Sequence, residues 1–501
     1  MGETVVQKIA RAHATDRSDR QHRPLRDGDV VYLRPRHILT HDNSWPVMKK
    51  FERLGADRLF DRSQPVMALD HDIQNSSPEN LEKYRRIEEF ARSRGADFHP
   101  AGTGIGHQLM MEGGYVLPGS LVVASDSHAN MYGALGAVGT PVVRTDAAVV
   151  WATGQFWWQV PPTVQVVLEG ALPPGVSGKD VILTLCALYP DEVLNAAVEF
   201  AGPGASSLTM ADRMTVANMT TEWGALVGWF PVDSHTVRWL SRRKKRLAGQ
   251  GIDRITDTML EEWTDDPPAP DADAPYAGRI TLELSRVTPE LSGPDTVRAA
   301  RPVPRPDDEP IRIDKAYVLS CVNGRVEDLE AAARVLRGRR VADGVELYVA
   351  AASKEVQEAA EAQGVWADLE AAGARTLPPG CGPCIGLGEG LLEAGQVGIS
   401  ATNRNFKGRM GSRDARIFLA SPEVVAASAV AGTVTLPGGN GRPAEGPGPE
   451  RLWEALSGGS GGQDEAVDIR PDFPRRYRGR LVFLPRDDLD TDGIYGKDHT
   501  Y

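Results

Sequence analysis

The chain carries the sequence Pro379-Gly380-Cys381-Gly382-Pro383-Cys384, and a third cysteine, Cys321, stands far upstream of it. These are three of only four cysteines in 501 residues. Three thiolates are one fewer than the four that usually close a zinc site or hold an iron–sulfur cube. A cluster held by three thiolates leaves one iron open, and an open metal is a Lewis acid for a hydroxyl or a carboxylate.

Two other interpretations of the Cys-Gly-Pro-Cys motif stay open at this point. Thioredoxin-like redox proteins use the same spacing at a helix N-terminus, which lowers the thiolate pKa, but an aromatic residue usually precedes their motif and Gly380 precedes this one. A zinc site with a histidine as fourth ligand is the second, although no histidine lies between Cys321 and the C-terminal tail. The fourth cysteine, Cys186, lies in an apolar run and is interpreted as a buried small hydrophobe.

Composition limits the class of protein. The chain is 41% hydrophobic and 25% charged, and its length predicts about two to four domains. A net charge of -12 argues against nucleic acid or a membrane surface as partner, and no apolar run approaches the length of a membrane span. Four cysteines that form no framework of close pairs suit a reducing compartment. We therefore expect a cytoplasmic protein, with the mitochondrial matrix as the alternative.

Three histidines stand at predicted strand ends or turns. A strand at 66–69 leads into Asp70-His71, a glycine-rich turn leads into His107, and a strand at 121–124 leads into Asp126-Ser127-His128. The carboxyl ends of strands are where α/β sheets place their chemistry. One such histidine is usually an ordinary hydrogen-bonded residue, but three of them with carboxylates nearby predict a site for proton transfer near neutral pH.

The rest of the pattern favours an α/β fold. Residues 30–33 are a predicted strand followed by a loop with His41, and residues 78–94 form a predicted helix with a Ser77 cap and a stop at Gly95. From residue 311 onward strands and helices alternate, which predicts a largely parallel sheet with Cys321 at its carboxyl edge. The basic run at 242–246 is interpreted as a solvated helix end.

Two further segments suggest a site. Asn218 and Glu222 are four residues apart and share one face of a predicted helix whose neighbours are apolar. Residues 401–409 are dense in amide and guanidinium groups, and Arg404 and Arg409 could bind carboxylates in bidentate fashion. Next to a cysteine loop, this segment is better interpreted as a carboxylate clamp than as a plain surface loop.

Taken together, these motifs resemble the aconitase superfamily, and most closely its homoaconitase branch. The resemblance covers roughly residues 5–436 and returns at about 478. The stretches that carry it are Asp70-His71, 104–108, 126–128, 218–225, 320–323, 380–384 and 403–409, with longer strings at 139–146 and 407–413. Val322 departs from the family pattern, because a threonine is usual there, so hydrogen bonding around a cluster could differ.

The resemblance implies three α/β/α subdomains around one [4Fe–4S] cluster, with only the start of a swivel domain. The corresponding ranges are 1–160, 161–310, 311–436, a flexible linker at 437–470, and a swivel start at 471–501. The family's Gly-Ser-Ser-Arg loop, whose serine resembles the general base, does not occur in the sequence. We therefore expect a separate swivel subunit, or a continuation of the chain, to supply that base.

The resemblance also implies roles for individual residues. Cys321, Cys381 and Cys384 would hold the cluster. The pairs that handle the leaving hydroxyl would be Asp70 with His71 and Asp126 with His107. Further site residues would be Ser127 and His128 in the lining, Glu222 facing the open iron, Arg404 and Arg409 on substrate carboxylates, Asn403 beside the cluster, and His41 as a polar substrate contact.

The implied activity is that of a hydro-lyase on a 2-hydroxy polycarboxylate, interconverting homocitrate, homoaconitate and homoisocitrate. Alternatives of the same class are the large subunit of 3-isopropylmalate dehydratase and an aconitase-like isomerase of specialised metabolism. A thioredoxin-like redox activity and a cluster-free RNA-binding role are alternative hypotheses of other classes.

Overall fold

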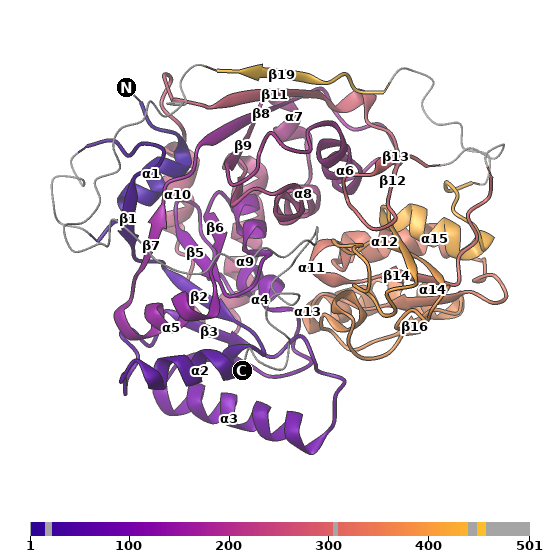
Figure 1. The fold of residues 1–501 in the computed structure, drawn as a ribbon, viewed down its shortest axis with the longest axis horizontal. Coiled ribbons are helices and arrows are strands. Elements are labelled where there is room, and N and C mark those ends of the chain that lie inside the picture. Colours follow the sequence, from indigo (N-terminus) through magenta and orange to yellow (C-terminus); the bar gives the residue numbers. More distant parts are fainter. Residues whose placement is uncertain (1, 16–22, 304–308, 439–447, 457–501) are drawn as a thin grey trace, which may run out of the picture. The chain divides into compact units, whose positions relative to one another are not determined.

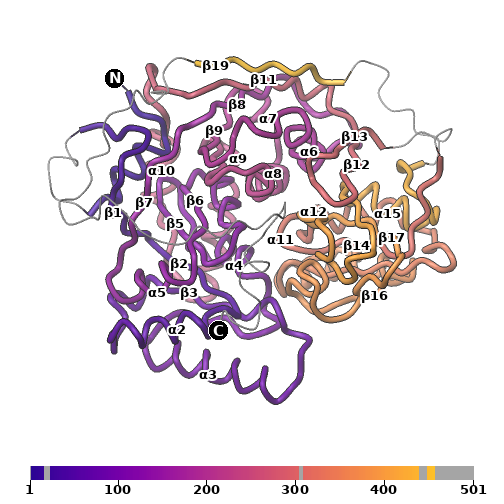
Figure 2. The backbone as a smooth tube through the Cα atoms, viewed as in Figure 1, coloured from indigo at the N-terminus to yellow at the C-terminus, as the bar shows by residue number. Residues whose placement is uncertain are grey.

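The structure is a computed structural model that describes residues 2–15, 23–303, 309–438 and 448–456. Three sheets of five, five and seven strands and one two-stranded ribbon contain its named strands. Figure 1 and Figure 2 show most of the orange elements around the third sheet and most of the indigo and magenta elements around the first two, with the yellow-orange β19 beside β11 of the second sheet. The predicted swivel start at 471–501 lies outside the described residues. Among the described helices, none has both the length and the apolar character of a membrane span.

The first sheet is parallel throughout, in the order β4-β3-β2-β5-β6. Its strands are β2 (His37–Thr40), β3 (Pro65–Ala68), β4 (Asp97–His99), β5 (Leu121–Ala124) and β6 (Val138–Pro141). The helical segments packed with it are α2 (Ser44–Arg53), α3 (Pro78–Arg94), α4 (Gly106–Glu112), η2 (Ala129–Leu135) and α5 (Arg144–Thr153). Chain order reverses between β2 and β5, and such a switch point is where open α/β sheets bind ligands.

The strand predicted at 30–33 exists as β1 (Val30–Leu33), but it does not lead directly into the loop with His41. It pairs in antiparallel fashion with β7 (Phe156–Gln159) in the two-stranded ribbon, near α1 (Val5–Ala12). The strand before His41 is β2, which the sequence analysis missed. Because β2 is buried on both faces, it has no alternation of polar and apolar residues to reveal it.

The predicted helix at 78–94 is confirmed as α3. The Ser77 side chain accepts a hydrogen bond from the Asn80 N–H, and Gly95 ends the helix with a φ of 71°. Tyr84, Ile87 and Phe90 form its buried face, whereas Leu81, at the same helical spacing, is 54% exposed. The basic run is only partly solvated: Arg243 is buried and pairs with Glu355.

The second sheet has the order β10-β9-β8-β11-β19. Its strands are β8 (Thr163–Glu169), β9 (Ala197–Ala201), β10 (Val227–Trp229), β11 (Gly278–Glu283) and β19 (Leu452–Ala455). Its helices are α6 (Gly178–Leu188), α7 (Pro203–Ser207), α8 (Met210–Trp223), α9 (Ser234–Ala248), α10 (Asp257–Asp265) and η3 (Leu284–Arg286). β19 pairs antiparallel with β11, so this part of the predicted flexible linker is a strand.

The third sheet has the order β13-β12-β18-β17-β14-β15-β16; β12 pairs antiparallel with both β13 and β18, and the other pairs are parallel. Its strands are β12 (Glu290–Ser292), β13 (Ala300–Pro302), β14 (Lys315–Val318), β15 (Glu346–Val349), β16 (Arg375–Thr376), β17 (Val397–Ser400) and β18 (Arg416–Leu419). Its helices are α11 (Ser320–Asn323), α12 (Val326–Leu336), α13 (Lys354–Ala362), α14 (Val365–Ala371), η4 (Gly382–Ile385) and α15 (Pro422–Ala431). Chain order in this sheet reverses between the neighbouring strands β14 and β17. Cys321 follows β14, and Asn403 follows β17.

Candidate functional site

Loops that follow strands of the first and third sheets enclose a cavity of about 80 Å³. It is lined by Asp70, His71, Ile105, His107, Asp126, Ser127, His128, Ser320, Cys321, Cys381, Cys384, Ile385, Asn403, Arg404 and Arg409. Two predicted site residues, His41 and Glu222, are not in this lining. They lie directly behind it, because His41 stacks on His71 and Glu222 bonds to His128 and Arg404.

The three cysteines are buried at the carboxyl edge of the third sheet. Cys321 lies in α11 after β14, and Cys381 and Cys384 lie at η4. Asn218 Nδ2 donates to Cys321 Sγ at 3.2 Å, and Asn403 contacts both Cys321 and Cys384 at 3.8 and 3.6 Å.

The environment of these thiols suits a bound cation. Burial raises the pKa of Cys381 to about 12, and burial together with the other two cysteines raises the pKa of Cys321 well above its usual value. Without a cation the thiols of Cys381 and Cys321 therefore favour the neutral form, and binding a metal group there would have to release their protons. The amide nitrogens of Asn218 and Asn403 that face Cys321 are donors of the kind that stabilise thiolate ligands, whereas Asn403 Oδ1 accepts from Cys384. The site thus fits an iron–sulfur group by its donor set.

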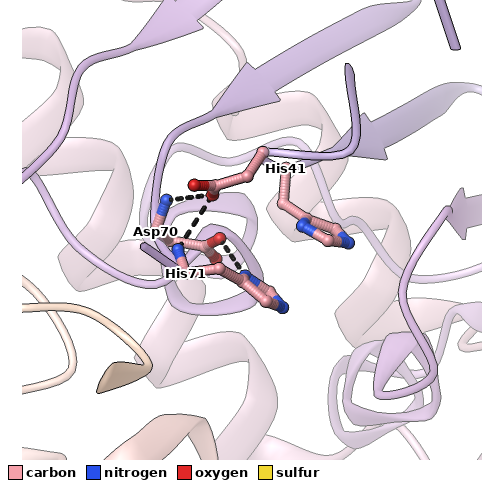
Figure 3. A group of neighbouring side chains, drawn as sticks. His41, Asp70 and His71 are labelled. Atoms are coloured by element: carbon pink, nitrogen blue, oxygen red, sulfur yellow. Dashed lines mark hydrogen bonds and ion pairs between the residues drawn. The ribbon is translucent and has the colours of Figure 1, made fainter. Parts of the chain in front are cut away.

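His71 and Asp70 form the first acid–base pair, shown in Figure 3. His71 Nδ1 lies 2.5 Å from Asp70 Oδ1, while Asp70 Oδ2 accepts a hydrogen bond from the Gly106 N–H at 2.7 Å. Burial lowers the pKa of His71, but its electrostatic interactions with Cys381 and Asp70 and its hydrogen bonds to Asp126 and Asp70 raise that pKa well above the usual value. His71 is therefore the protonated member of this part of the site.

His41 stacks on His71 with ring centroids 3.8 Å apart and 14° between the ring planes. Burial and the charge of His71 lower the pKa of His41 to about 4. The stacked rings thus form a neutral and a charged imidazole, which avoids placing two positive charges in contact.

Asp42 holds the backbone of the His71 loop in place. Its Oδ2 accepts hydrogen bonds from the N–H groups of Asp70 and His71 at 3.0 and 2.9 Å, and its Oδ1 accepts from the Asp72 N–H at 3.1 Å. Tyr84 donates a further bond to Oδ1. Burial opposes ionisation, but His71, Tyr84 and the backbone donors lower the pKa of Asp42 to about 2. The sequence analysis did not single out Asp42, although its position beside His41 at a strand end was a usable signal.

Asp126 connects the remaining histidines. Its Oδ1 lies 2.7 Å from His107 Nε2 and accepts from the His128 N–H at 3.0 Å, and its Oδ2 lies 3.5 Å from His71 Nε2. Burial would raise the pKa of Asp126, but His107 and its other partners lower it well below the usual range. Tyr132 fixes the far side of the His107 ring, with its Oη 2.9 Å from Nδ1.

Arg404 and Arg409 line the other side of the cavity, and Glu222 lies behind this lining. Glu222 Oε1 lies 2.9 Å from His128 Nε2 and accepts from Arg404 Nε at 2.8 Å. Within the described part of the chain, the buried Glu222 Oε2 and Arg409 Nε have no hydrogen-bond partner. An unpaired acceptor and an unpaired donor therefore lie at the cavity or directly behind its lining. Ser127 also lines the cavity.

Residues 7–432 of this chain match the sequence model of the family described as "Aconitase family (aconitate hydratase)". The chain is 54% identical to "Homoaconitase, mitochondrial" of Eremothecium gossypii over 100% of this chain and 74% of that protein. The homoaconitase of Yarrowia lipolytica is 52% identical over 95% of this chain and 71% of its own length. The holo-form structure of Thermococcus kodakaraensis aconitase X has a TM-score of 0.44 at 13% identity, covering 75% of this chain and 84% of that one, too weak a likeness to carry an argument. The α/β fold and the resemblance that the motifs predicted are thereby confirmed, and the chain belongs to the aconitase family.

Proposed function

We propose that this chain is a hydro-lyase that interconverts homocitrate and homoisocitrate through homoaconitate. The observation that carries the proposal is the single cavity in which three buried thiols face paired histidines and carboxylates, with two arginines at its edge. The names of the two homoaconitases described above support homoaconitate over isopropylmalate as substrate. The same names support the mitochondrial alternative over the cytoplasmic one.

We further propose that Cys321, Cys381 and Cys384 hold one [4Fe–4S] cluster. Their burial, their converging positions and the amides of Asn218 and Asn403 support this assignment. When bound through three thiolates, such a cluster supplies an open Lewis-acidic iron for a hydroxyl and a carboxylate.

The chain's own residues would orient the substrate and move its protons. Arg404 and Arg409 would hold carboxylates, since a guanidinium fork matches a carboxylate in bidentate geometry. His71, cationic beside Asp70, and His107, held by Asp126, are the donors placed to protonate the departing hydroxyl, which leaves as water. Glu222 Oε2 is an acceptor for that hydroxyl or for the water formed.

The proton on the adjacent carbon must go to a base. Following the family resemblance, we assign this base to a serine of a swivel domain, supplied by a separate subunit or by a continuation of the chain. The chain with its cluster but without a swivel should therefore bind substrate and turn it over poorly.

The test is an anaerobic assay of the cluster-loaded chain on homoaconitate, aconitate and isopropylmalate, with and without a swivel protein. We expect hydration of homoaconitate that depends on the swivel. Full turnover by the chain alone would contradict the assignment of the base. Failure on all three substrates with cluster and swivel present would contradict the proposed function, and insulin reduction would point to the redox alternative.

A further inference from the structure

Lys179, near the start of α6, is fully buried, with an exposed fraction of 0%. Its Nζ donates to the carbonyl oxygen of Ala401 at 3.0 Å and to that of Thr402. No carboxylate among the described residues forms an ion pair with it. A buried lysine without a paired charge is rare, because transferring an ammonium group out of water is costly. The burial of this ammonium group therefore indicates a specific role for Lys179.

The two carbonyl groups lie at a functionally important point of the backbone. They belong to the last residues before Asn403 and Arg404, in the segment that leaves β17. Asn403 contacts the sulfur atoms of Cys321 and Cys384, and Arg404 bonds to Glu222. The ammonium group thus holds the backbone from which two cavity-lining side chains project.

The charge of Lys179 also lies near the site, because it bonds to the carbonyl group of Thr402, and the next residue, Asn403, contacts Cys321 and Cys384. Burial is the main influence on its pKa and lowers it to about 8, while Glu222, Asp180, Asp328 and Cys384 act in the opposite direction. Two of these groups, Glu222 and Cys384, belong to the candidate site. If Cys384 and the other two cysteines held a metal group as thiolates, they would add negative charge near Lys179.

We propose that Lys179 is a positioning residue of the active site: it fixes the Ala401–Thr402 backbone so that Asn403 and Arg404 face the cavity, and its positive charge offsets that of the cysteine thiolates. The charge role of Lys179 rests on the proposed function, because it needs the cluster to be present. The positioning role does not, because it concerns only hydrogen bonds within the chain.

The experiment compares Lys179→Met, which keeps length but removes charge and donors, with Lys179→Gln and Lys179→Arg. Lys315→Met is the matched control, since Lys315 is also a buried lysine that donates to a carbonyl oxygen, that of Leu391 at 2.8 Å, but lies outside the cavity. The readouts are amide hydrogen exchange of residues 400–406 in cluster-free protein, KM and kcat with cluster and swivel, and the midpoint potential of the cluster.

Lys179→Met should speed exchange in residues 400–406 and raise KM about ten- to a hundredfold, the range expected when hydrogen bonds to a charged group are lost. The cluster potential should become more negative, because a positive charge that favours the reduced state is gone. Lys179→Arg should keep the potential of the wild type, and Lys315→Met should change none of the three.

Normal exchange and normal KM in a folded Lys179→Met protein would overturn the positioning role. If that variant does not fold, Lys179→Gln decides by the same readouts. A potential that shifts equally in Lys179→Arg would overturn the charge role. If the wild type itself loads no cluster and hydrates no substrate, the proposed function is wrong. Amide hydrogen exchange of residues 400–406 in the cluster-free protein still tests the positioning role.

Discussion

Replacing Asp42 by asparagine tests how the His71 loop is held. The Asp42 carboxylate accepts from three consecutive backbone N–H groups and from Tyr84. An amide offers only one oxygen, so its NH₂ group would face N–H donors on one side. The pKa of Asp42 is lowered from 3.8 to about 2, which corresponds to about 2 kcal/mol in favour of the ionised form in the folded protein. We expect Asp42→Asn to lower the free energy of unfolding by about that amount at pH 7.

The sign of the pH dependence follows from the lowered pKa. The stabilisation is complete above the unfolded pKa of 3.8 and is lost as pH falls towards about 2, so the wild type and Asp42→Asn should converge in acid. Activity should fall further than stability suggests, because a displacement of a catalytic group by about 1 Å can cost roughly a hundredfold.

The assay is urea unfolding of cluster-free protein at several pH values, with hydration kinetics of the loaded enzyme beside it. Asp72→Asn is the matched control from the same loop. Asp72 is partly exposed and its carboxylate bonds to Asn75, so a change within about 0.5 kcal/mol is expected. The reasoning is refuted if Asp42→Asn unfolds at the wild-type urea concentration at pH 7, or if both variants lose equal stability.

Three further predictions concern the cluster, the clamp and a remote acid. Cys321→Ser, and likewise the serine variants of Cys381 and Cys384, should lose the bound iron measured after anaerobic reconstitution, whereas Cys186→Ser should keep it; a full iron content in Cys321→Ser contradicts the ligand set. Arg409→Lys should raise KM about ten- to a hundredfold with iron unchanged, because it keeps the charge but loses the fork, and unchanged kinetics would remove Arg409 from the site. Burial raises the pKa of Glu199 from 4.5 to about 7, so this group should lower stability by about 3 kcal/mol as pH rises through that range. Glu199→Gln should abolish that decline in urea unfolding midpoints, and parallel pH profiles for both proteins would contradict it.

Much of the candidate site could be predicted because its residues follow strands. His71, Asp126, Cys321 and Asn403 all come soon after buried strands of parallel sheets, and the carboxyl ends of such strands converge at one edge. The limits of α3 were equally visible, since a serine cap and a left-handed glycine are local signals. These features need no knowledge of the tertiary structure.

The positioning residues could not be found in the same way. Asp42 binds backbone N–H groups, and Lys179 binds carbonyl groups 222 and 223 positions away. Every residue carries such groups, so no side-chain pattern indicates which of them will be bound. Nor did the basic run reveal that Arg243 alone turns inward, because its partner Glu355 lies 112 positions away.

The functional residues themselves connect the elements that carry them. The Cys381 N–H, after β16, donates to the Asp70 carbonyl oxygen at 2.7 Å, which joins the cysteine loop to the loop of His71. Asn218 of α8 donates to Cys321, and Arg404 after β17 donates to Glu222 at the end of α8. Groups that would bind a cofactor, move protons and hold carboxylates are therefore in mutual contact. A shift of any one loop must change the geometry of the others, so effects of substitutions at these contacts should not be treated as independent.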